Sequence, residues 1–176
     1  MKTYNEIHDF THRIPSFLTQ KQLERDGKIV KQIVTAHDVE CDNEKMLDVF
    51  FKKCHLLSNP RFWEIMRTVW CAAGNHSNVE RFKQLMSSNK PAKSWFMTIE
   101  DKATYDCLTY PILLYRAYDA RYKDKGISWT SNFDWAMQYA VNNGLTLKRQ
   151  VFRKEEIFAY VSRRGEDEFI ILQNEK

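Results

Sequence analysis

The chain has 176 residues, 43% of them hydrophobic and 28% charged, which suits one folded domain with a substantial core. Its 27 basic and 23 acidic residues give a net charge of +4, too balanced for a protein that mainly binds nucleic acid. No apolar run approaches the roughly 20 residues of a membrane-spanning helix. The first ten residues also lack the apolar segment of a secretory signal, so we expect a cytoplasmic protein.

The four cysteines, at positions 41, 54, 71 and 107, lack the spacing of a disulfide framework or a zinc site. Cys54 and His55 can be combined with Cys41 and His37 into a hypothetical metal set, but that spacing matches no standard site. We therefore expect reduced thiols and no bound metal.

Residues 1 to about 109 have the apolar periodicity of helices. The third helix begins at Asn59-Pro60, with Asn as its cap and Pro at its first position, and Gly74 ends it. We expect the Trp, Phe and Met stripes of these helices to form core. The predicted helices are, in chain order, 19–33, 44–57, 60–73, a short one carrying Val79, Phe82, Leu85 and Met86, and one opened by the capping box of Thr98 and Asp101.

From Pro111 onward the pattern changes to strands, with one helix from about Asn132 to Val141. Ser131 and Asp134 are the expected caps of that helix, which 142–144 closes. We predict a single α+β domain in which an N-terminal helical layer (1–109) packs on a small, split, mixed β-sheet (110–176). The predicted strands are 112–118, 127–130, 147–152, 157–162 and 168–172.

Three polar features stand out in the strand-rich part. Arg116 lies inside the apolar stretch ILLYRAY, where its charge is costly unless an anion meets it. Ser128 and Thr130 are two residues apart on one strand and so share a face, with Trp129 on the other face. Three adjacent carboxylates, residues 166–168, repel one another at the start of an apolar strand, which calls for a cation, a ligand or a function.

Structural interpretations of the same residues remain open. Arg116 can pair with Asp119 or with one of the carboxylates at 166–168. Ser131 is favoured as a helix cap over a ligand-binding residue. Thr130 is a residue that strands prefer, residues 166–168 can form a solvated turn, and the basic residues at 163–164 can neutralise them.

The order of YRAY, GISWTS, a helix and RRGEDEFII resembles the Arg, Ser-x-Ser/Thr, Glu-x-Glu signature of the ADP-ribosyltransferases. More narrowly, it is similar to compact bacterial and phage proteins with a YRG…GxSWT…RxEEEIIV layout. The resemblance covers roughly residues 111 to 173 and implies an ADP-ribosyltransferase-like fold with NAD as substrate.

The resemblance also implies roles. Arg116 holds a phosphate of NAD, because its planar guanidinium suits bidentate phosphate contact. Ser128 orients Glu168, which binds the nicotinamide ribose and stabilises the positive charge that develops as nicotinamide leaves. Glu166 faces the acceptor. The further NAD-binding residues expected are Thr130, on the face of Ser128, and three aromatic walls for the nicotinamide ring: Tyr118, Trp129 and Phe133.

Absent residues narrow these expectations. All five histidines (8, 12, 37, 55 and 76) precede the strand-rich part, which disfavours the His-Tyr-Glu branch of the superfamily and excludes a Ser-His or Cys-His triad within that part. There is no GxGxxG or GxxxxGK[ST] motif for a Rossmann or P-loop site. Arg116 and Ser128 are only 12 residues apart, whereas larger family members insert a helix there.

The resemblance therefore predicts a mono-ADP-ribosyltransferase that transfers ADP-ribose from NAD to a protein acceptor, with arginine as the candidate residue. One alternative is a non-catalytic relative that binds and blocks a host factor. The other is an NAD glycohydrolase toxin, which would have an antitoxin as a further partner. We expect no membrane or nucleic-acid partner.

Overall fold

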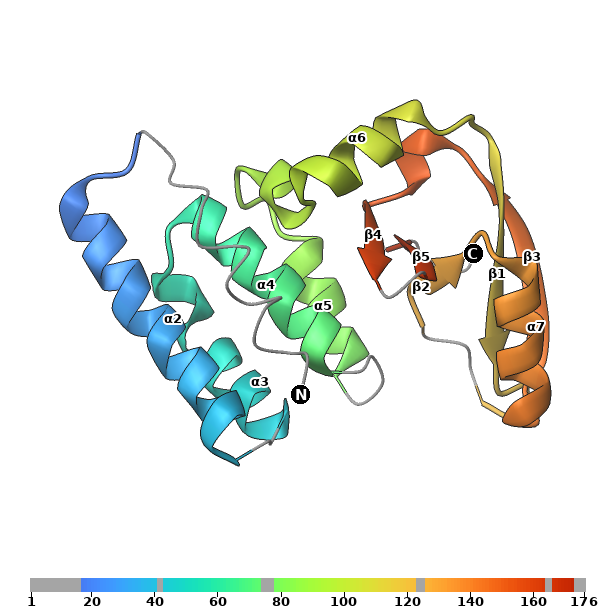
Figure 1. Ribbon diagram of the computed structural model, residues 1–176, viewed down its shortest axis with the longest axis horizontal. Coiled ribbons are helices and arrows are strands. Elements are labelled where there is room, and N and C mark those ends of the chain that lie inside the picture. The colour runs from blue at the N-terminus through green and yellow to red at the C-terminus, as the bar shows by residue number, and fades with distance from the viewer. Residues whose placement is uncertain (1–16, 41–42, 74–77, 123–125, 164–165, 173–176) are drawn as a thin grey trace. The chain divides into compact units, whose positions relative to one another are not determined.

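The computed structural model describes residues 17–40, 43–73, 78–122, 126–163 and 166–172. The chain divides into two compact units (Figure 1). Of the described residues, those up to 73 and residues 89–96 form the helical unit, and residues 78–88 and those from 97 onward form the sheet unit. Two helices, α5 (Val79–Met86) and α6 (Ile99–Cys107), therefore group with the sheet. The chain is an α+β protein, as the sequence predicts.

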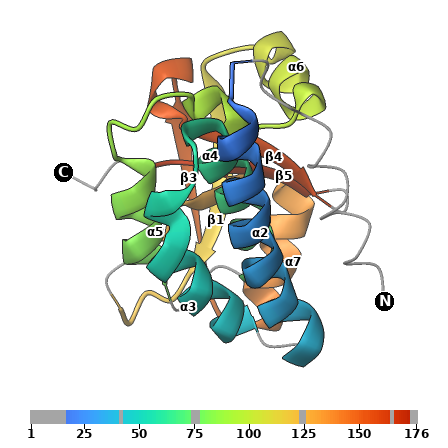
Figure 2. The same ribbon diagram turned by 90° about the vertical axis from the view of Figure 1, so that its left-hand side faces the viewer.

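In the helical unit, three helices lie side by side in both views (Figures 1 and 2). They are α2 (Gln20–Glu40), α3 (Asn43–Lys53) and α4 (Asn59–Ala73), accompanied by the short 3-10 turns η2 (Cys54–Leu56) and η3 (Lys93–Phe96). The first helix is longer than predicted and runs through Gly27, which is tolerated at an exposed helical position at a cost of about 1 kcal/mol. The largest buried side chains of this unit include Phe50, Phe62 and Trp63, as the apolar stripes predict.

A buried polar junction fixes the start of α4. Ser58, not Asn59, precedes the first helical residue, and its carbonyl accepts from Phe62 N–H at 2.8 Å. The carboxylate of Asp26, on α2, accepts from both the N–H and the hydroxyl of Ser58. The cap is therefore one residue earlier than predicted, because the partner that satisfies it comes from another helix and leaves no trace in the local sequence.

The five strands of the sheet unit form one sheet in the order β3-β1-β2-β5-β4. Every pairing in it is antiparallel, so the expectation of a split, mixed sheet is wrong. β2 and β3 do run in the same direction, but they flank β1 and do not pair with each other. The strands are β1 (Ile112–Tyr118), β2 (Ser128–Thr130), β3 (Thr146–Phe152), β4 (Ala159–Arg163) and β5 (Glu166–Ile170), with the 3-10 turn η4 (Lys154–Glu156) between β3 and β4.

The strand register separates the two faces of this sheet. Residues directly opposite each other on neighbouring antiparallel strands point to the same face, and successive residues alternate. One face, called the Thr130 face, includes Tyr115, Ser128, Thr130, Glu168 and Ile170. The opposite face, called the Trp129 face, includes Leu114, Arg116, Trp129, Phe152, Tyr160, Asp167 and Phe169.

Helix α7 (Phe133–Asn142) connects β2 to β3 and contacts β1 and β3 (Figure 1). Its N-cap is Asn132, whose side-chain oxygen accepts from Trp135 N–H at 3.0 Å, so the predicted cap Ser131 is wrong by one residue. Ala136 and Ala140 are its buried residues, which allows close packing. Gly144, with a φ of 62°, ends the helix as a Schellman motif in which Leu145 N–H donates to the carbonyl of Ala140 at 2.8 Å.

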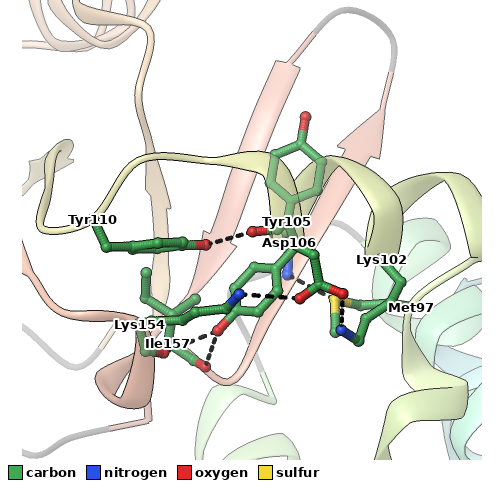
Figure 3. Close-up of polar contacts among 8 residues, drawn as sticks. Met97, Lys102, Tyr105, Asp106, Tyr110, Lys154 and Ile157 are labelled. Carbon is green, nitrogen blue, oxygen red and sulfur yellow. Dashed lines mark hydrogen bonds and ion pairs between the residues drawn. The ribbon is translucent and has the colours of Figure 1, made fainter.

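Helix α6 is opened by the predicted capping box of Thr98 and Asp101, which is confirmed. Buried Asp101 also accepts from Ser162 N–H on β4 at 3.0 Å, so the cap joins helix to sheet. Figure 3 shows the second junction, where the Tyr105 hydroxyl donates to the carbonyl of Lys154 at 2.9 Å. The Lys154 ammonium lies 5.0 Å from the Tyr105 ring centroid and 3.0 Å from the Asp106 carboxylate.

Within the described part of the chain, none of the helices has the length and apolar character needed to cross a membrane.

Candidate functional site

Thr130 and Glu168 lie directly opposite each other on β2 and β5. Side chains in this arrangement have Cβ atoms about 5 Å apart, close enough for a hydroxyl and a carboxylate to interact. Thr130 is 7% exposed and its hydroxyl oxygen accepts from Asn132 N–H at 3.1 Å, which fixes the side chain. The structure therefore places the fixed hydroxyl of Thr130 opposite Glu168, the predicted catalytic carboxylate. One sequence interpretation had treated Thr130 only as a residue that strands prefer.

Ser128 belongs to the same face, two residues further along β2, and lies opposite Ile170. It is a diagonal neighbour of Glu168, at a typical Cβ separation of about 7 Å. The predicted alternation of Ser128 and Thr130 against Trp129 is confirmed. The predicted role of Ser128 in orienting Glu168 stays a prediction, and the register makes Thr130 the nearer hydroxyl.

Phe133, the first residue of α7, is brought to this face through Tyr115. Tyr115 lies opposite Thr130 on β1, and its ring meets the Phe133 ring edge-on with centroids 5.2 Å apart. Phe133 is 44% exposed. An exposed aromatic ring in this position is available to contact a ligand.

Arg116 starts on the opposite face, in the row of Trp129, and its partner on β3 is Lys148. Its guanidinium nevertheless extends to Gly126, two residues before Ser128. A Cβ built on Gly126 would overlap the guanidinium, so glycine at this position leaves the room that the arginine occupies. The guanidinium thus lies near the start of β2, although Arg116 occupies a strand position whose side chain leaves the sheet on the Trp129 face.

The predicted alternative partner of Arg116, Asp119, is engaged elsewhere. Its carboxylate accepts from the Nε and Nη2 atoms of Arg121 at 2.9 and 2.7 Å. The hydrogen bonds from Arg121 lower the pKa of Asp119 to about 2. This exposed pair closes the turn after β1.

Trp129 and Tyr118 are not brought together with Ser128, Thr130 and Glu168, because both belong to the Trp129 face. Trp129 is 6% exposed, and its ring meets Phe152 edge-on with centroids 4.9 Å apart. These contacts make Trp129 a core residue of the sheet. Successive side chains of a strand point alternately to its two faces, and the sequence does not indicate which of these faces would bind a ligand.

The acidic stretch 166–168 belongs to β5, not to a turn before it. Its three residues therefore alternate between faces, which separates Asp167 from Glu168. The main chain of Glu166 pairs with that of Arg163 on β4, and its side chain lies outside the described residues. The predicted role of Glu166 toward an acceptor stays a prediction.

Asp167 is bound from two sides on the Trp129 face. Its Oδ1 accepts from the Tyr160 hydroxyl at 2.5 Å and its Oδ2 from the Ser131 hydroxyl at 3.2 Å. Burial, and then the hydrogen bond to Asp167, raise the pKa of the Tyr160 phenol above its ordinary value. Ser131, predicted as a helix cap, is thus a partner of the acidic strand.

Sequence reasoning missed Tyr115, the role of Gly126 and the engagement of Asp167. Tyr115 could have been found from parity, since it alternates with Arg116 on the same strand. A glycine just before a short strand is a recognised sign of close approach by another group. The partners of Asp167 depend on strand register, which the sequence does not specify.

A carboxylate opposite a fixed hydroxyl, with a second hydroxyl on the same face, can stabilise a cationic sugar centre. A guanidinium at Gly126, before the start of β2, can bind a phosphate. Among the residues described, no group of three or more His, Cys, Asp or Glu side chains is arranged to hold a metal ion. Comparisons with models of known protein families, with curated proteins and with solved structures found no match to the chain.

Proposed function

We propose that the protein is an NAD-dependent mono-ADP-ribosyltransferase that uses the Thr130 face of its sheet to bind the nicotinamide ribose. The observation that carries the proposal is the direct pairing of Thr130 with Glu168. It supports the proposal because cleavage of the nicotinamide bond creates an oxocarbenium-like centre, which a carboxylate beside the ribose stabilises. Ser128 on the same face adds a second hydroxyl for the ribose.

In this proposal the Arg116 guanidinium binds a phosphate of NAD at the start of β2. Its position against Gly126 supports that role, because the missing side chain at Gly126 gives the guanidinium room beside the start of β2. Phe133, exposed beside Tyr115, is the aromatic residue best placed to contact the nicotinamide ring. The acceptor is a protein, with arginine as the candidate residue.

The test follows nicotinamide release and the transfer of labelled ADP-ribose from NAD to proteins of a cell lysate. Glu168→Gln is expected to lower both by about 100-fold or more, because it removes the charge that stabilises the transition state. The matched control is Glu155→Gln, a 70% exposed carboxylate on η4, which is expected to retain wild-type rates. Equal rates for wild type and Glu168→Gln would contradict the proposal.

Two alternatives share this fold. An NAD glycohydrolase would use the same residues with water as the acceptor, so it would release nicotinamide without labelling any protein. A non-catalytic relative that binds a host factor is favoured by one observation: α7 exposes five large apolar side chains, Phe133, Trp135, Met137, Tyr139 and Val141. That alternative predicts that calorimetric titration of the protein with millimolar NAD gives no heat of binding. The Arg116→Ala variant would then give the same result as the wild type.

A further inference from the structure

Three elements of the sheet unit meet at the Asp167 carboxylate. Tyr160 reaches it from β4 with an O···O distance of 2.5 Å, and Ser131 reaches it from the residue after β2 at 3.2 Å. Asp167 itself belongs to β5, which lies between those two strands. One carboxylate oxygen accepts from Tyr160 on β4 and the other from Ser131, just after β2, so the side chain joins β5 to both neighbouring segments.

This network acts at the residue next to Glu168. Adjacent strand residues point to opposite faces, so a shift of β5 by one residue would exchange Asp167 and Glu168 between the faces. In the observed register, the hydroxyls of Tyr160 and Ser131 donate to the Asp167 carboxylate, which is on the Trp129 face. The arrangement that satisfies them is also the one that sets Glu168 opposite Thr130.

The choice of aspartate supports a role beyond strand formation. Aspartate is disfavoured in strands, and the partly buried carboxylate of Asp167 has a hydrogen bond to each oxygen, which offsets the cost of its partial burial. The Tyr160 side chain is itself held, because its ring meets Phe169 edge-on at 5.2 Å between centroids and the residue is 4% exposed. A rigid donor on one side and a strand-end donor on the other leave Asp167 little freedom.

We infer that Asp167 is a positioning residue: with Tyr160 and Ser131 it holds β5 in the register and orientation that present Glu168 to the NAD ribose. The inference rests on the proposed function for its ligand. The geometric part, that Asp167 fixes Glu168 against Thr130, stands separately and is tested separately.

The geometric part is tested by NMR on the full chain. In the wild type, we expect a nuclear Overhauser effect between the Thr130 methyl group and the Glu168 side chain, and slow exchange of the Glu168 amide proton. Asp167→Asn should weaken the first and speed the second at least tenfold, because an amide offers one acceptor where two are needed. Ser131→Ala, which removes one donor without a charge, should produce a smaller change of the same kind.

The functional part is tested by the kinetics of nicotinamide release. Asp167→Asn should lower kcat roughly tenfold or more while KM for NAD changes less than twofold, because small displacements of a catalytic group are costly and binding groups are retained. The matched control is Asp134→Asn, which changes an exposed carboxylate in the first turn of α7 and should keep wild-type kinetics.

The outcomes separate the two claims. Loss of the Thr130–Glu168 contact in Asp167→Asn, in a chain that never releases nicotinamide, would support positioning and contradict the proposed function. A folded Asp167→Asn variant with wild-type kcat and an unchanged contact would overturn the positioning role. A fall in unfolding free energy alone, with kcat and the contact intact, would overturn it equally. If Asp167→Asn does not fold, Ser131→Ala decides by the same measurements.

Discussion

The two units of the protein use polar side chains in different ways. In the helical unit, Asp26 is 1% exposed and both of its oxygens accept from a single neighbour, Ser58. In the sheet unit, Ser128 and Glu168 are only partly buried and lie on a sheet face beside an exposed aromatic ring. The contrast teaches that polar groups of similar type occupy different environments in the two units, and that burial and the identity of the partner distinguish them.

The largest effect is expected from the core of the helical unit. Trp63 is 0% exposed, and its indole N–H donates to the carbonyl of Pro91 at 2.7 Å. Trp63→Ala should lower the free energy of unfolding by about 3–5 kcal/mol, because it leaves a cavity and an unpaired carbonyl. Urea denaturation checks this. A loss below about 1 kcal/mol would mean that the helical unit does not depend on this core.

Next in size is the junction between α2 and α4. Asp26→Ala leaves the buried N–H and hydroxyl of Ser58 without their acceptor and should cost about 1–3 kcal/mol in unfolding free energy. The heat of NAD binding should not change while the protein is folded. Asp48→Ala, an exposed residue of α3, is the control and should change stability by less than about 0.5 kcal/mol.

Two glycines sharpen the comparison. Gly126→Ala should displace the Arg116 guanidinium and weaken NAD binding by roughly tenfold, or about 1.4 kcal/mol, with little change in stability because the displaced group is the end of a flexible side chain. Gly27→Ala, where a Cβ meets nothing within 4 Å, should stabilise α2 by about 0.5–1 kcal/mol and leave NAD binding unchanged. Calorimetric titration and urea denaturation measure both. Wild-type NAD affinity in Gly126→Ala would remove Arg116 from the proposed site.

A smaller effect is expected at alkaline pH. Burial raises the pKa values of Tyr105, Tyr110 and Tyr160 above the ordinary value of 10. The folded state therefore keeps protons that the unfolded state loses, so this stability is complete below pH 10 and falls as the pH rises further. Absorbance of phenolate at 295 nm should show these three tyrosines ionising above the ordinary value of 10. Tyr160→Phe should remove part of the pH dependence.

The smallest effect concerns the pair after β1. Arg121→Ala should leave stability and NAD binding unchanged at neutral pH, because both side chains reach solvent. The pKa of Asp119, lowered to about 2 by Arg121, should return toward its ordinary value of 3.8. NMR titration of the Asp119 carboxyl carbon checks this. An unchanged pKa in Arg121→Ala would assign the shift to another group, with Arg116 as the first candidate.

Much of the fold could be predicted from the sequence because it depends on local patterns. Alternation in 112–118 and the capping box at Thr98 identify β1 and α6 correctly. The cap of α4 was misplaced because Asp26, 32 residues away, provides its partner. The all-antiparallel pairing and the face of Arg116 were missed for the same reason: strand order and register depend on contacts between distant segments.

The candidate site was predictable only in part. Motif order brought Ser128, Thr130 and Glu168 into consideration, and the register places all three on one face. Residue spacing also predicted that Trp129 lies on the other face of its strand. Motif order could not show that Tyr118 shares the face of Trp129, or that Ser131 binds Asp167 instead of capping α7. A one-residue shift in a strand or in a helix cap changes these contacts, and the alternating and capping patterns of the sequence fit either position equally well.

The most direct test of the proposed chemistry is the rate of nicotinamide release from saturating NAD, compared between wild type and Glu168→Gln. The account predicts measurable release by the wild type and a loss of about 100-fold or more in the variant, with both proteins folded and both binding NAD. Undetectable release by the wild type, or equal release by the two proteins, would contradict it.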